Sequence, residues 1–355
     1  MWISNQIFEE DLKSICSSVF VEWEKLENRN ILITGATGLI GYTLTSAILY
    51  YGKIYNKKVN VIALVRDIDK AKEKFQEQLS DNVALRFIKG TVENLPNIDV
   101  AIDYIIHGAC PTVSSLFSNS PVETISTILD GTQNILKLAK EKNVSGCVYL
   151  SSMEVYGEVF TKEKLLEENL GSINILSPRS SYPEGKRMAE LICSSYFHEY
   201  KVPVCIARLA QTFGPGISIE DNRVFGFMLR SAINNKNIEL KADGLKENMY
   251  LYTADAATGI LVLLTKGSGG MSYNIANENT YCSVKDMGKL VLETFGKGEL
   301  KVLTNVGAEE AKKIYPPNSF MNLDVTKLKK LGWNATTGLN DMYLRMYKAI
   351  INEKD

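Results

Sequence analysis

The chain has very little histidine, and its cysteines are not arranged in pairs. Its 355 residues include two histidines, His107 and His198, and six cysteines, none of which forms a C-x-x-C pair. Zinc sites and disulfide frameworks depend on such clusters. The sequence therefore argues against both, and we expect no metal site. Scattered, unpaired cysteines favour a reducing compartment, so we expect a cytoplasmic protein.

The chain also lacks a net charge and long apolar runs. Forty Lys and Arg residues against 41 Asp and Glu residues give a net charge of -1, which offers no electrostatic basis for binding nucleic acid or an anionic membrane. No apolar stretch reaches the ~18 residues that span a bilayer. The N-terminal MWISNQIFEEDLKSI carries acids where a signal peptide carries positive charge. We expect neither a membrane nor nucleic acid as a partner.

Apolar segments of strand length alternate with segments of helical periodicity. The strand-like segments are NILIT, VNVIALV, LRFIKGTV, DYIIHGAC and GCVYLSS. Alternation of this kind predicts an α/β fold with a doubly wound parallel sheet. Beyond Lys186 the pattern is more interrupted, which indicates a smaller lobe that binds substrate, including the chain from Met271 onward. The predicted units are a helical extension (1–28), a nucleotide-binding domain (29–215) and a mainly substrate-binding lobe (216–355), with 238–265 returning to the nucleotide-binding domain.

The first 28 residues place apolar side chains at roughly helical spacing between acidic and basic ones. This predicts one or two helices packed on the outside of the main domain. Binding of a partner protein is the alternative for this extension.

A glycine motif follows the first predicted strand. GATGLIG places Gly35, Gly38 and Gly41 between a strand and a helix, which is the context of a Rossmann-type dinucleotide site. Gly35 permits the tight turn, and Gly38 lets the backbone approach a diphosphate at the helix N-terminus. Gly41 lets the helix lie close to the sheet.

The end of the second predicted strand leaves the cofactor preference open. An acid there would bind the ribose 2'-hydroxyl of NAD, but the sequence reads Val65, Arg66, Asp67. Arg66 could face the 2'-phosphate of NADP or stack on adenine. Asp67 could bind the ribose after a small shift in register.

Three residues between Ser151 and Lys186 suggest proton-transfer chemistry. Tyr182 and Lys186 lie four residues apart at the start of a predicted helix, so their side chains share one face. An ammonium beside a phenol lowers the pKa of the phenol, which could then accept a proton from a sugar hydroxyl. Ser152, at the end of CVYLSS, could hydrogen-bond the same oxygen. Taken alone, the pair is weak evidence and more often marks an exposed tyrosine beside a solvated lysine.

Several motifs together resemble a known family from Asn30 to near the C-terminus. TGATGLIG, HGAC, DGTQNIL, SSMEVYG, YPEGK, ARLAQTFGP and LDVTKLKKLGW resemble the extended short-chain dehydrogenase/reductases, the NAD-dependent nucleotide-sugar epimerases, dehydratases and decarboxylases. Within it, PVETISTIL, NILSPRSSYPEGKRMAE and TFGPGISIEDNRV are most similar to the UDP-glucuronate decarboxylases. The resemblance implies tightly bound NAD, with NADP left open, and a nucleotide-diphosphate sugar as substrate.

The resemblance also implies roles for particular residues. Tyr182 would be the base for the sugar C4 hydroxyl, Lys186 would tune Tyr182 and bind the nicotinamide ribose, and Ser152 would bind the C4 oxygen. Glu154 would act at C5 once C4 is a ketone, although a buried structural glutamate is the alternative. Met153 stands where dehydratases carry a proton donor, and a thioether donates no proton, which counts against 4,6-dehydration.

Further contacts are carried over from the same motifs. The implied cofactor contacts are Gly35, Thr37, Gly38, Leu39, Ile40, Gly41, Arg66, His107, Ala109, Asn134, Tyr182 and Lys186. The implied substrate contacts are Cys110, Met153, Arg179, Gln211, Arg223 and Asn248. Arg179 and Arg223 suit a carboxylate or a diphosphate.

The sequence departs from the family pattern at the diphosphate pocket. Asn248 stands where many members carry an arginine that binds phosphate, and Lys246 is the candidate to compensate for it. Gln211 replaces an asparagine, and Thr91 replaces an aspartate that meets adenine. The nucleotide sugar therefore stays open.

Several alternatives to decarboxylation remain from the sequence. They are 4-epimerisation, 4,6-dehydration, NADPH-dependent reduction of a 4-keto sugar, and a dinucleotide-sensing protein without catalysis. The resemblance also implies a homodimer formed through the helix after PVETI and the helix bearing Tyr182. The apolar residues that would permit it are Ile135, Leu136, Leu138, Leu191 and Ile192.

Overall fold

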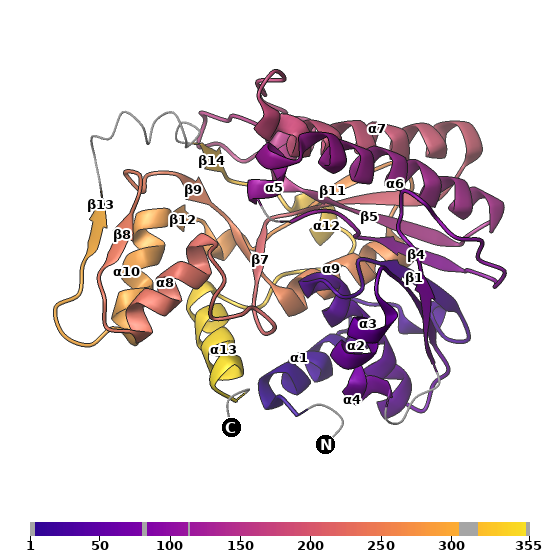
Figure 1. Ribbon diagram of the computed structural model, residues 1–355, viewed down its shortest axis with the longest axis horizontal. Coiled ribbons are helices and arrows are strands. Elements are labelled where there is room, and N and C mark those ends of the chain that lie inside the picture. The colour runs from indigo at the N-terminus through magenta and orange to yellow at the C-terminus, as the bar shows by residue number, and fades with distance from the viewer. Residues whose placement is uncertain (1–3, 80–83, 113, 305–318, 353–355) are drawn as a thin grey trace.

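A parallel sheet of seven strands forms the centre of the protein (Figure 1). The computed structural model describes residues 4–79, 84–112, 114–304 and 319–352. Along the sheet the strand order is β3-β2-β1-β4-β5-β6-β11. The strands are β1 (Asn30–Thr34), β2 (Asn60–Val65), β3 (Leu85–Lys89), β4 (Tyr104–His107), β5 (Gly146–Ser152), β6 (Val204–Leu209) and β11 (Ser272–Ile275). The predicted doubly wound α/β fold is confirmed.

Successive strand residues point to opposite faces of the sheet, so the sheet separates two hydrophobic cores. In β1, Ile31 and Ile33 face one core and Leu32 faces the other. The first core is covered by α2 (Leu39–Ile54) and α9 (Thr253–Lys266), and the second by α6 (Pro121–Glu141) and α7 (Ser181–Tyr200). Because both faces are covered, the central strands β1, β2, β4, β5 and β6 are mostly apolar rather than alternating, whereas the edge strand β3 is only partly buried.

The seventh strand differs from the sequence-based expectation. We expected nothing from Met271 onward to extend the sheet, yet β11 pairs in parallel with β6, with Ser272 opposite Ile206. The strand has four residues and follows a glycine-rich turn, so its pattern is too short to distinguish from a loop. Only pairing with β6 reveals it.

The second lobe consists of short strands and helices at the left of Figure 1. Within 238–265, α9 packs on the main sheet, whereas β8 pairs with β13, and β9 pairs with β12 and β14. Strands β7 and β10 pair in parallel. The bounds are β7 (Gln211–Phe213), α8 (Val224–Ile233), β8 (Ile238–Leu240), β9 (Glu247–Asn248), β10 (Tyr250–Tyr252), β12 (Cys282–Ser283), α10 (Val284–Phe295), β13 (Val302–Thr304), β14 (Phe320–Met321), α12 (Thr326–Lys329) and α13 (Leu339–Asn352). The exact domain limits stay a prediction.

The N-terminal extension forms α1 (Gln6–Cys16) and the 3-10 turn η1 (Trp23–Lys25). Helix α1 contacts α2, α9 and α13 and buries Leu12 and Ile15 completely. The apolar spacing therefore produced a packed helix, although Val19 between the two elements is exposed. The remaining elements are α3 (Ile68–Lys74), α4 (Gln76–Leu79), α5 (Ser114–Asn119), η2 (Met153–Tyr156), η3 (Pro178–Ser180) and η4 (Glu278–Thr280).

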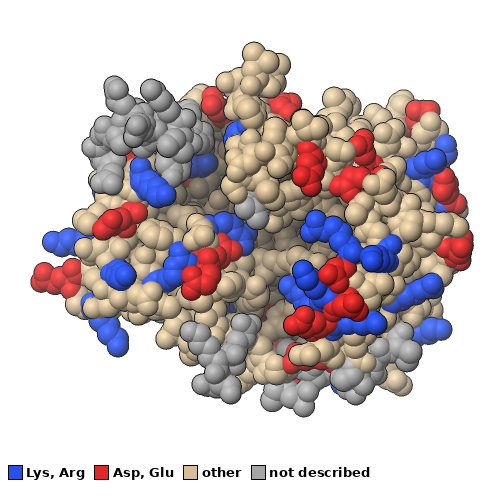
Figure 2. Space-filling view, viewed as in Figure 1, with Lys and Arg blue, Asp and Glu red and all other residues tan. Residues whose placement is uncertain are grey.

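The surface carries both signs of charge. Lys and Arg atoms intermingle with Asp and Glu atoms on the face shown in Figure 2. Among the described residues, no helix is long and apolar enough to cross a membrane.

Candidate active site

The glycine turn between β1 and α2 has the geometry of a dinucleotide site. Gly35 adopts φ +72°, and a Cβ there would lie 2.8 Å from the Gly108 carbonyl. A Cβ on Gly41 would lie 2.2 Å from the Gly35 carbonyl oxygen, so Gly41 allows the helix to approach the turn. Thr37 and Gly38 are exposed at the start of α2. The backbone N–H groups of the first turn of α2 point out of the helix N-terminus, which suits a diphosphate.

The predicted cofactor residue His107 has a structural role. Thr34 Oγ1 accepts hydrogen bonds from the backbone N–H groups of Gly108 (3.2 Å) and Ala109 (3.1 Å) and lies 2.8 Å from His107 Nδ1. The Thr34 proton is therefore donated to Nδ1, and Nε2–H donates to Thr132 Oγ1 at 3.3 Å. Both ring nitrogens are occupied. The hydrogen bonds of His107 thus connect the ends of β1 and β4 next to the glycine turn, and both of its ring nitrogens are used within the protein.

The buried His107 ring makes stability depend on pH. Burial, assisted by the charge of Lys186, lowers the pKa of His107 from 6.5 to about 3. Between these values the unfolded chain binds more protons, so the native state loses about 1.4 kcal/mol per pH unit as the pH falls below 6.5. In urea unfolding, we expect the stability advantage of wild type over His107→Gln to shrink by about 2 kcal/mol between pH ~7.5 and ~5. An advantage that stays constant with pH would contradict the neutral buried ring.

Two side chains predicted for the adenosine end of the cofactor have other partners. Asn134 Nδ2 donates to the carbonyls of Val92 (3.0 Å) and Glu93 (2.9 Å) and so holds the loop after β3. Asp67 caps α3 by accepting from the N–H groups of Asp69 and Lys70. Its carboxylate is therefore committed to the helix.

Arg66 lies exposed next to this loop. Burial would raise the pKa of Glu93, but the hydrogen bond from Thr127 and the charge of Arg66 help to lower it. The lowered pKa keeps Glu93 ionised near the charge of Arg66. A role of Arg66 in binding adenosine stays a prediction.

Strand β5 places the predicted serine and glutamate at its carboxyl end. Ser152 ends the strand and is the N-cap of η2, where its Oγ accepts from the Glu154 N–H at 3.2 Å. Tyr182 starts α7 from the neighbouring side, and its pKa is affected by a hydrogen bond with Ser152 and by the charge of Glu154. The structure therefore brings Ser152, Glu154 and Tyr182 together.

Phe117 was not identified from the sequence. Its ring in α5 stacks on Tyr182, with centroids 4.2 Å apart and planes at 11°, and the Arg179 guanidinium carbon lies 4.9 Å from the centroid of the same ring. Ser181 Oγ donates to the Phe117 carbonyl at 2.8 Å. Phe117 therefore orients both Tyr182 and Arg179. A lone phenylalanine in a six-residue helix gives no signal in the sequence.

The expected lowering of the Tyr182 pKa is wrong for this structure. Burial is the largest influence and raises the pKa, and Cys110 and Glu154 raise it further, while Ser152 and Arg179 oppose them. Lys186 Nζ lies 5.8 Å from the Tyr182 ring centroid and donates to the Leu150 carbonyl at 2.7 Å. The helical spacing was correct, but the buried environment outweighs the ammonium.

Glu154 forms an ion pair inside the site. Arg179 Nη2 lies 2.7 Å from Glu154 Oε2, and the two side chains are 40% and 33% exposed. Burial lowers the pKa of Lys246, with Glu154 opposing and Arg179 adding to the effect. One carboxylate and two cations therefore share a position next to Tyr182. Lys246 was considered from the sequence only as a substitute for a missing arginine.

Of the other predicted substrate contacts, some have unpaired polar atoms and others are apolar or already paired. Gln211 Oε1 and Asn248 Oδ1 are buried and have no hydrogen-bond partner among the described residues. Cys110 is partly buried; burial raises its pKa, and Lys186 opposes the rise. Met153, in contrast, is buried in the core, so it offers no polar contact. Arg223 pairs with Asp221 at 2.7 Å in an exposed position.

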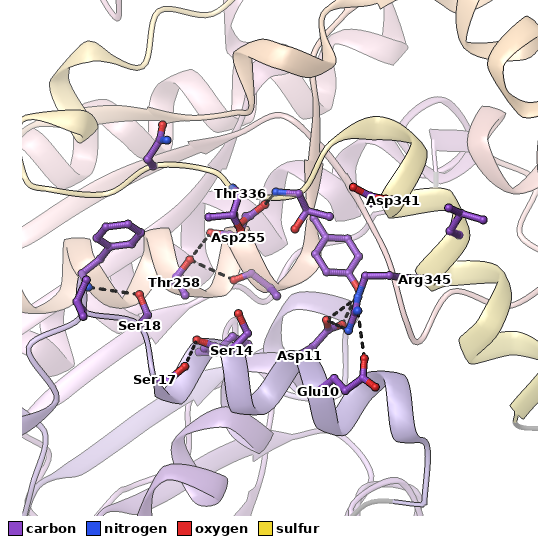
Figure 3. Close-up of a pocket in the computed structure, with 18 of the residues that line it drawn as sticks. Glu10, Asp11, Ser14, Ser17, Ser18, Asp255, Thr258, Thr336, Asp341 and Arg345 are labelled. Carbon is purple, nitrogen blue, oxygen red and sulfur yellow. Dashed lines mark hydrogen bonds and ion pairs between the residues drawn. The ribbon is translucent and has the colours of Figure 1, made fainter. Parts of the chain in front are cut away.

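A cavity of about 670 Å³ lies elsewhere, between α1, α9 and α13 (Figure 3). None of the predicted site residues lines it. Its buried acids are already paired: Asp11 with Arg345 (2.7 Å) and Tyr252 (2.6 Å), and Asp255 with the backbone and hydroxyl of Thr336. The described residues contain no cluster of three or more potential metal ligands.

Comparison with protein families agrees with this geometry. Residues 31–276 match the model of the NAD dependent epimerase/dehydratase family. The chain belongs to this family. The match spans both the glycine turn and the residues that surround Tyr182, so the family relationship covers the whole candidate site.

Individual members of the NAD dependent epimerase/dehydratase family are similar over most of the chain. UDP-glucuronic acid decarboxylase 6 of Arabidopsis thaliana is 28% identical over 316 residues, which are 88% of this chain and 86% of that protein. UDP-glucuronic acid decarboxylase 1 of Xenopus tropicalis is 25% identical, covering 89% and 70%. Among solved structures, UDP-glucuronic acid 4-epimerase from Bacillus cereus, with UDP-glucuronic acid and NAD, has a TM-score of 0.72, 24% identity and coverage of 91% and 99%.

Proposed function

We propose that the protein oxidises a UDP-hexuronic acid transiently at C4, with NAD as the tightly bound cofactor, and releases the C6 carboxylate as CO2. The ion pair between Arg179 and Glu154 beside Tyr182 carries this proposal, because it places a carboxylate-binding guanidinium where the sugar must react. The names of the decarboxylase relatives support the same substrate.

The cofactor site fits NAD at its diphosphate end. Gly35 and Gly41 have no room for a Cβ, and the exposed start of α2 offers backbone donors. When bound, NAD accepts and returns the hydride, and its nicotinamide ring adds positive charge near Tyr182. Lys186 would hold the nicotinamide ribose, and Thr37, Leu39, Ile40 and Ala109 would border the cofactor.

Proton transfer follows from the positions of the side chains. Tyr182 removes the proton of the C4 hydroxyl as the C4 hydride leaves, and Ser152 holds the same oxygen. The resulting 4-ketone stabilises the electron pair left at C5 when the C5–C6 bond breaks and CO2 departs. Glu154, once a substrate carboxylate has displaced it from Arg179 and it has taken up a proton from solvent, gives that proton to C5. Return of the hydride to C4 and of the proton from Tyr182 regenerates the site.

Arg179 and Lys246 would hold the substrate carboxylate before it leaves. In the structure, Arg179 binds Glu154 at 2.7 Å, so a substrate carboxylate competes for the guanidinium and releases Glu154. Arg223 would contact the diphosphate or stay with Asp221. Gln211, Asn248 and Cys110 would border the sugar and diphosphate.

Incubation of the purified protein with UDP-glucuronate tests the proposed function. We expect release of CO2, formation of a UDP-pentose by mass spectrometry, and transient absorbance at about 340 nm from reduced cofactor. Formation of neither CO2 nor UDP-pentose would exclude the decarboxylase.

Epimerisation at C4 is the second candidate. Ser152, Tyr182 and Lys186 would hold the C4 oxygen, its proton and the cofactor in the same way for either reaction, with NAD as the oxidant. Only the fate of the C5–C6 bond differs. UDP-galacturonate would then replace CO2 and UDP-pentose as the product of the same incubation. Stoichiometric consumption of NADPH with a 4-keto sugar would instead indicate the reductase that exposed Arg66 leaves open.

We further propose that the protein acts as a homodimer in the cytoplasm. The residues expected at the interface need correction, because Ile135, Leu136 and Leu138 are buried in the core of the chain itself. The large hydrophobic side chains that α6 and α7 leave exposed are Val122, Ile125, Met188, Leu191 and, at the end of α7, Tyr200. All six cysteines are free thiols, in keeping with a reducing compartment.

A charge at the exposed face of α7 tests the dimer. We expect Leu191→Glu to turn a dimeric protein into a monomer in light scattering, because an unpaired carboxylate would be buried in an apolar interface. Leu303→Glu changes an exposed leucine of the second lobe and should leave the dimer intact. A wild type that is already monomeric, or a Leu191→Glu dimer, would contradict this interface.

A further inference from the structure

A buried ion pair lies directly behind the catalytic residues. Arg208 of β6 donates through Nε and Nη2 to both carboxylate oxygens of Glu190 in α7, at 3.0, 3.1 and 2.7 Å. Ser151 Oγ donates to Glu190 Oε1 at 2.5 Å. The three residues are 4%, 8% and 5% exposed. Their side chains are bonded to one another, so their polar atoms are already used within the protein.

The remaining guanidinium nitrogen of Arg208, Nη1, contacts the C-terminal end of η2. Arg208 Nη1 donates to the Tyr156 hydroxyl at 3.2 Å and to the Glu167 carbonyl at 2.6 Å. The Tyr156 hydroxyl donates to Asn274 Oδ1 in β11 at 2.6 Å. Asn274 N–H in turn donates to the Glu167 carboxylate at 2.9 Å. Arg208 therefore joins β5, η2, α7, β6 and β11 through satisfied buried hydrogen bonds.

Each proposed catalytic residue lies close along the chain to a member of this network. Ser151 precedes Ser152, and Tyr156 is two residues after Glu154. Glu190 follows Lys186 by four residues on the same helix, and Tyr182 lies one turn before Lys186. The network thus fixes the two elements whose relative position determines the distance between the serine and the tyrosine.

We infer that Glu190 and Arg208 are positioning residues, whose ion pair sets the register of α7 against the end of β5 for hydride and proton transfer. This inference rests on the proposed function. A buried ion pair is often no more stabilising than a well-packed apolar pair of similar volume. Stability and positioning can therefore be separated by experiment.

The test uses a double variant that removes the charges but keeps the volume. In Glu190→Leu/Arg208→Met, we expect kcat for UDP-glucuronate to fall about 100-fold, because misplacement of reacting groups by about 1 Å has effects of this size. We expect KM to change by less than about threefold. Glu190→Gln keeps one acceptor oxygen for Ser151 and Arg208 but loses the ion pair, so we expect kcat to fall by less than in the double variant. If the double variant does not fold, kcat and its pH profile are measured for the single variants Glu190→Gln and Glu190→Leu instead. Equal kcat values in these two variants would overturn the positioning role.

The Asp11–Arg345 pair in Figure 3 provides a matched control. It also joins a buried carboxylate, an arginine and a tyrosine hydroxyl, with Arg345 Nε donating to Tyr252 at 3.0 Å, but it lies between α1 and α13. Asp11→Leu/Arg345→Met should shift the unfolding temperature comparably and leave kcat unchanged. Equal kcat in the two double variants would overturn the positioning role.

Crystal structures of the two double variants give a readout that does not need turnover. We expect the Ser152 Oγ to Tyr182 Oη distance to change by about 0.5 Å or more in the Glu190/Arg208 variant only. Unchanged positions would overturn the inference. Wild-type protein that leaves UDP-glucuronate unconverted would contradict the proposed function, and these structures would still decide the positioning role.

Discussion

Tyr182→Phe is expected to lower turnover of UDP-glucuronate by about 10²–10⁴-fold while leaving NAD binding unchanged. The substitution removes only the phenolic oxygen, and the ring can keep its stacking on Phe117 at 4.2 Å. Without the hydroxyl, no group accepts the C4 proton as the hydride leaves. Absorbance at about 340 nm in a single turnover measures this step directly, because reduced cofactor should not form.

Tyr200→Phe is the control for this experiment. Tyr200 lies at the opposite end of the same helix and is exposed, so its loss of a hydroxyl should not affect turnover. If Tyr182→Phe still reduces the cofactor at the wild-type rate, the assignment of the base is wrong. The raised pKa of Tyr182 adds a further expectation: ionisation of this phenol depends on positive charge brought in with the cofactor.

Glu154→Gln is expected to separate oxidation from the later chemistry. Tyr182, Ser152 and Lys186 remain, so reduced cofactor should still form when substrate is added. The carboxylic acid that donates the proton to C5 is lost, and we expect steady-state formation of UDP-pentose to fall by about 10²–10⁴-fold. Reduced cofactor should therefore accumulate in the variant, as measured by absorbance, while CO2 release and product are followed separately.

The Glu154→Gln variant also changes the surroundings of Arg179, which affects substrate binding. It loses its charged partner at 2.7 Å, so binding of the anionic substrate should be retained or tightened. Glu163→Gln changes an exposed carboxylate of the following loop and serves as the control. Unchanged product formation by Glu154→Gln would show that the glutamate is not needed at C5. Glu154 would then have only a structural role, through its ion pair with Arg179.

Local chemistry was well predicted where the pattern spans a few residues. The turn at Gly35 needs a positive φ, and Tyr182 and Lys186 lie one turn apart because both follow from short-range geometry. The hydrogen-bond partners of the His107 ring were not predicted, since Thr34 and Thr132 lie 73 and 25 residues away in the chain. A single histidine in a strand does not reveal which neighbours it will meet.

The same limit explains the pKa of Tyr182. Spacing along a helix predicts the neighbouring ammonium, whereas the degree of burial depends on α5 and on the packing of Phe117. Desolvation increases with every element that covers the phenol. Only the folded protein shows that burial is the largest influence on the pKa of Tyr182.

By itself, the sequence determined the alternating α/β order, the glycine turn and the side chains that α7 presents on one face, because these depend on backbone preferences and residue period. Tertiary structure decided the pairing of β11, the contact of Arg179 with Glu154, and the ion pair of Arg208 with Glu190 behind them. Such contacts join residues far apart in the chain. Their free energy comes from burial and charge pairing that exist only after the sheet has assembled.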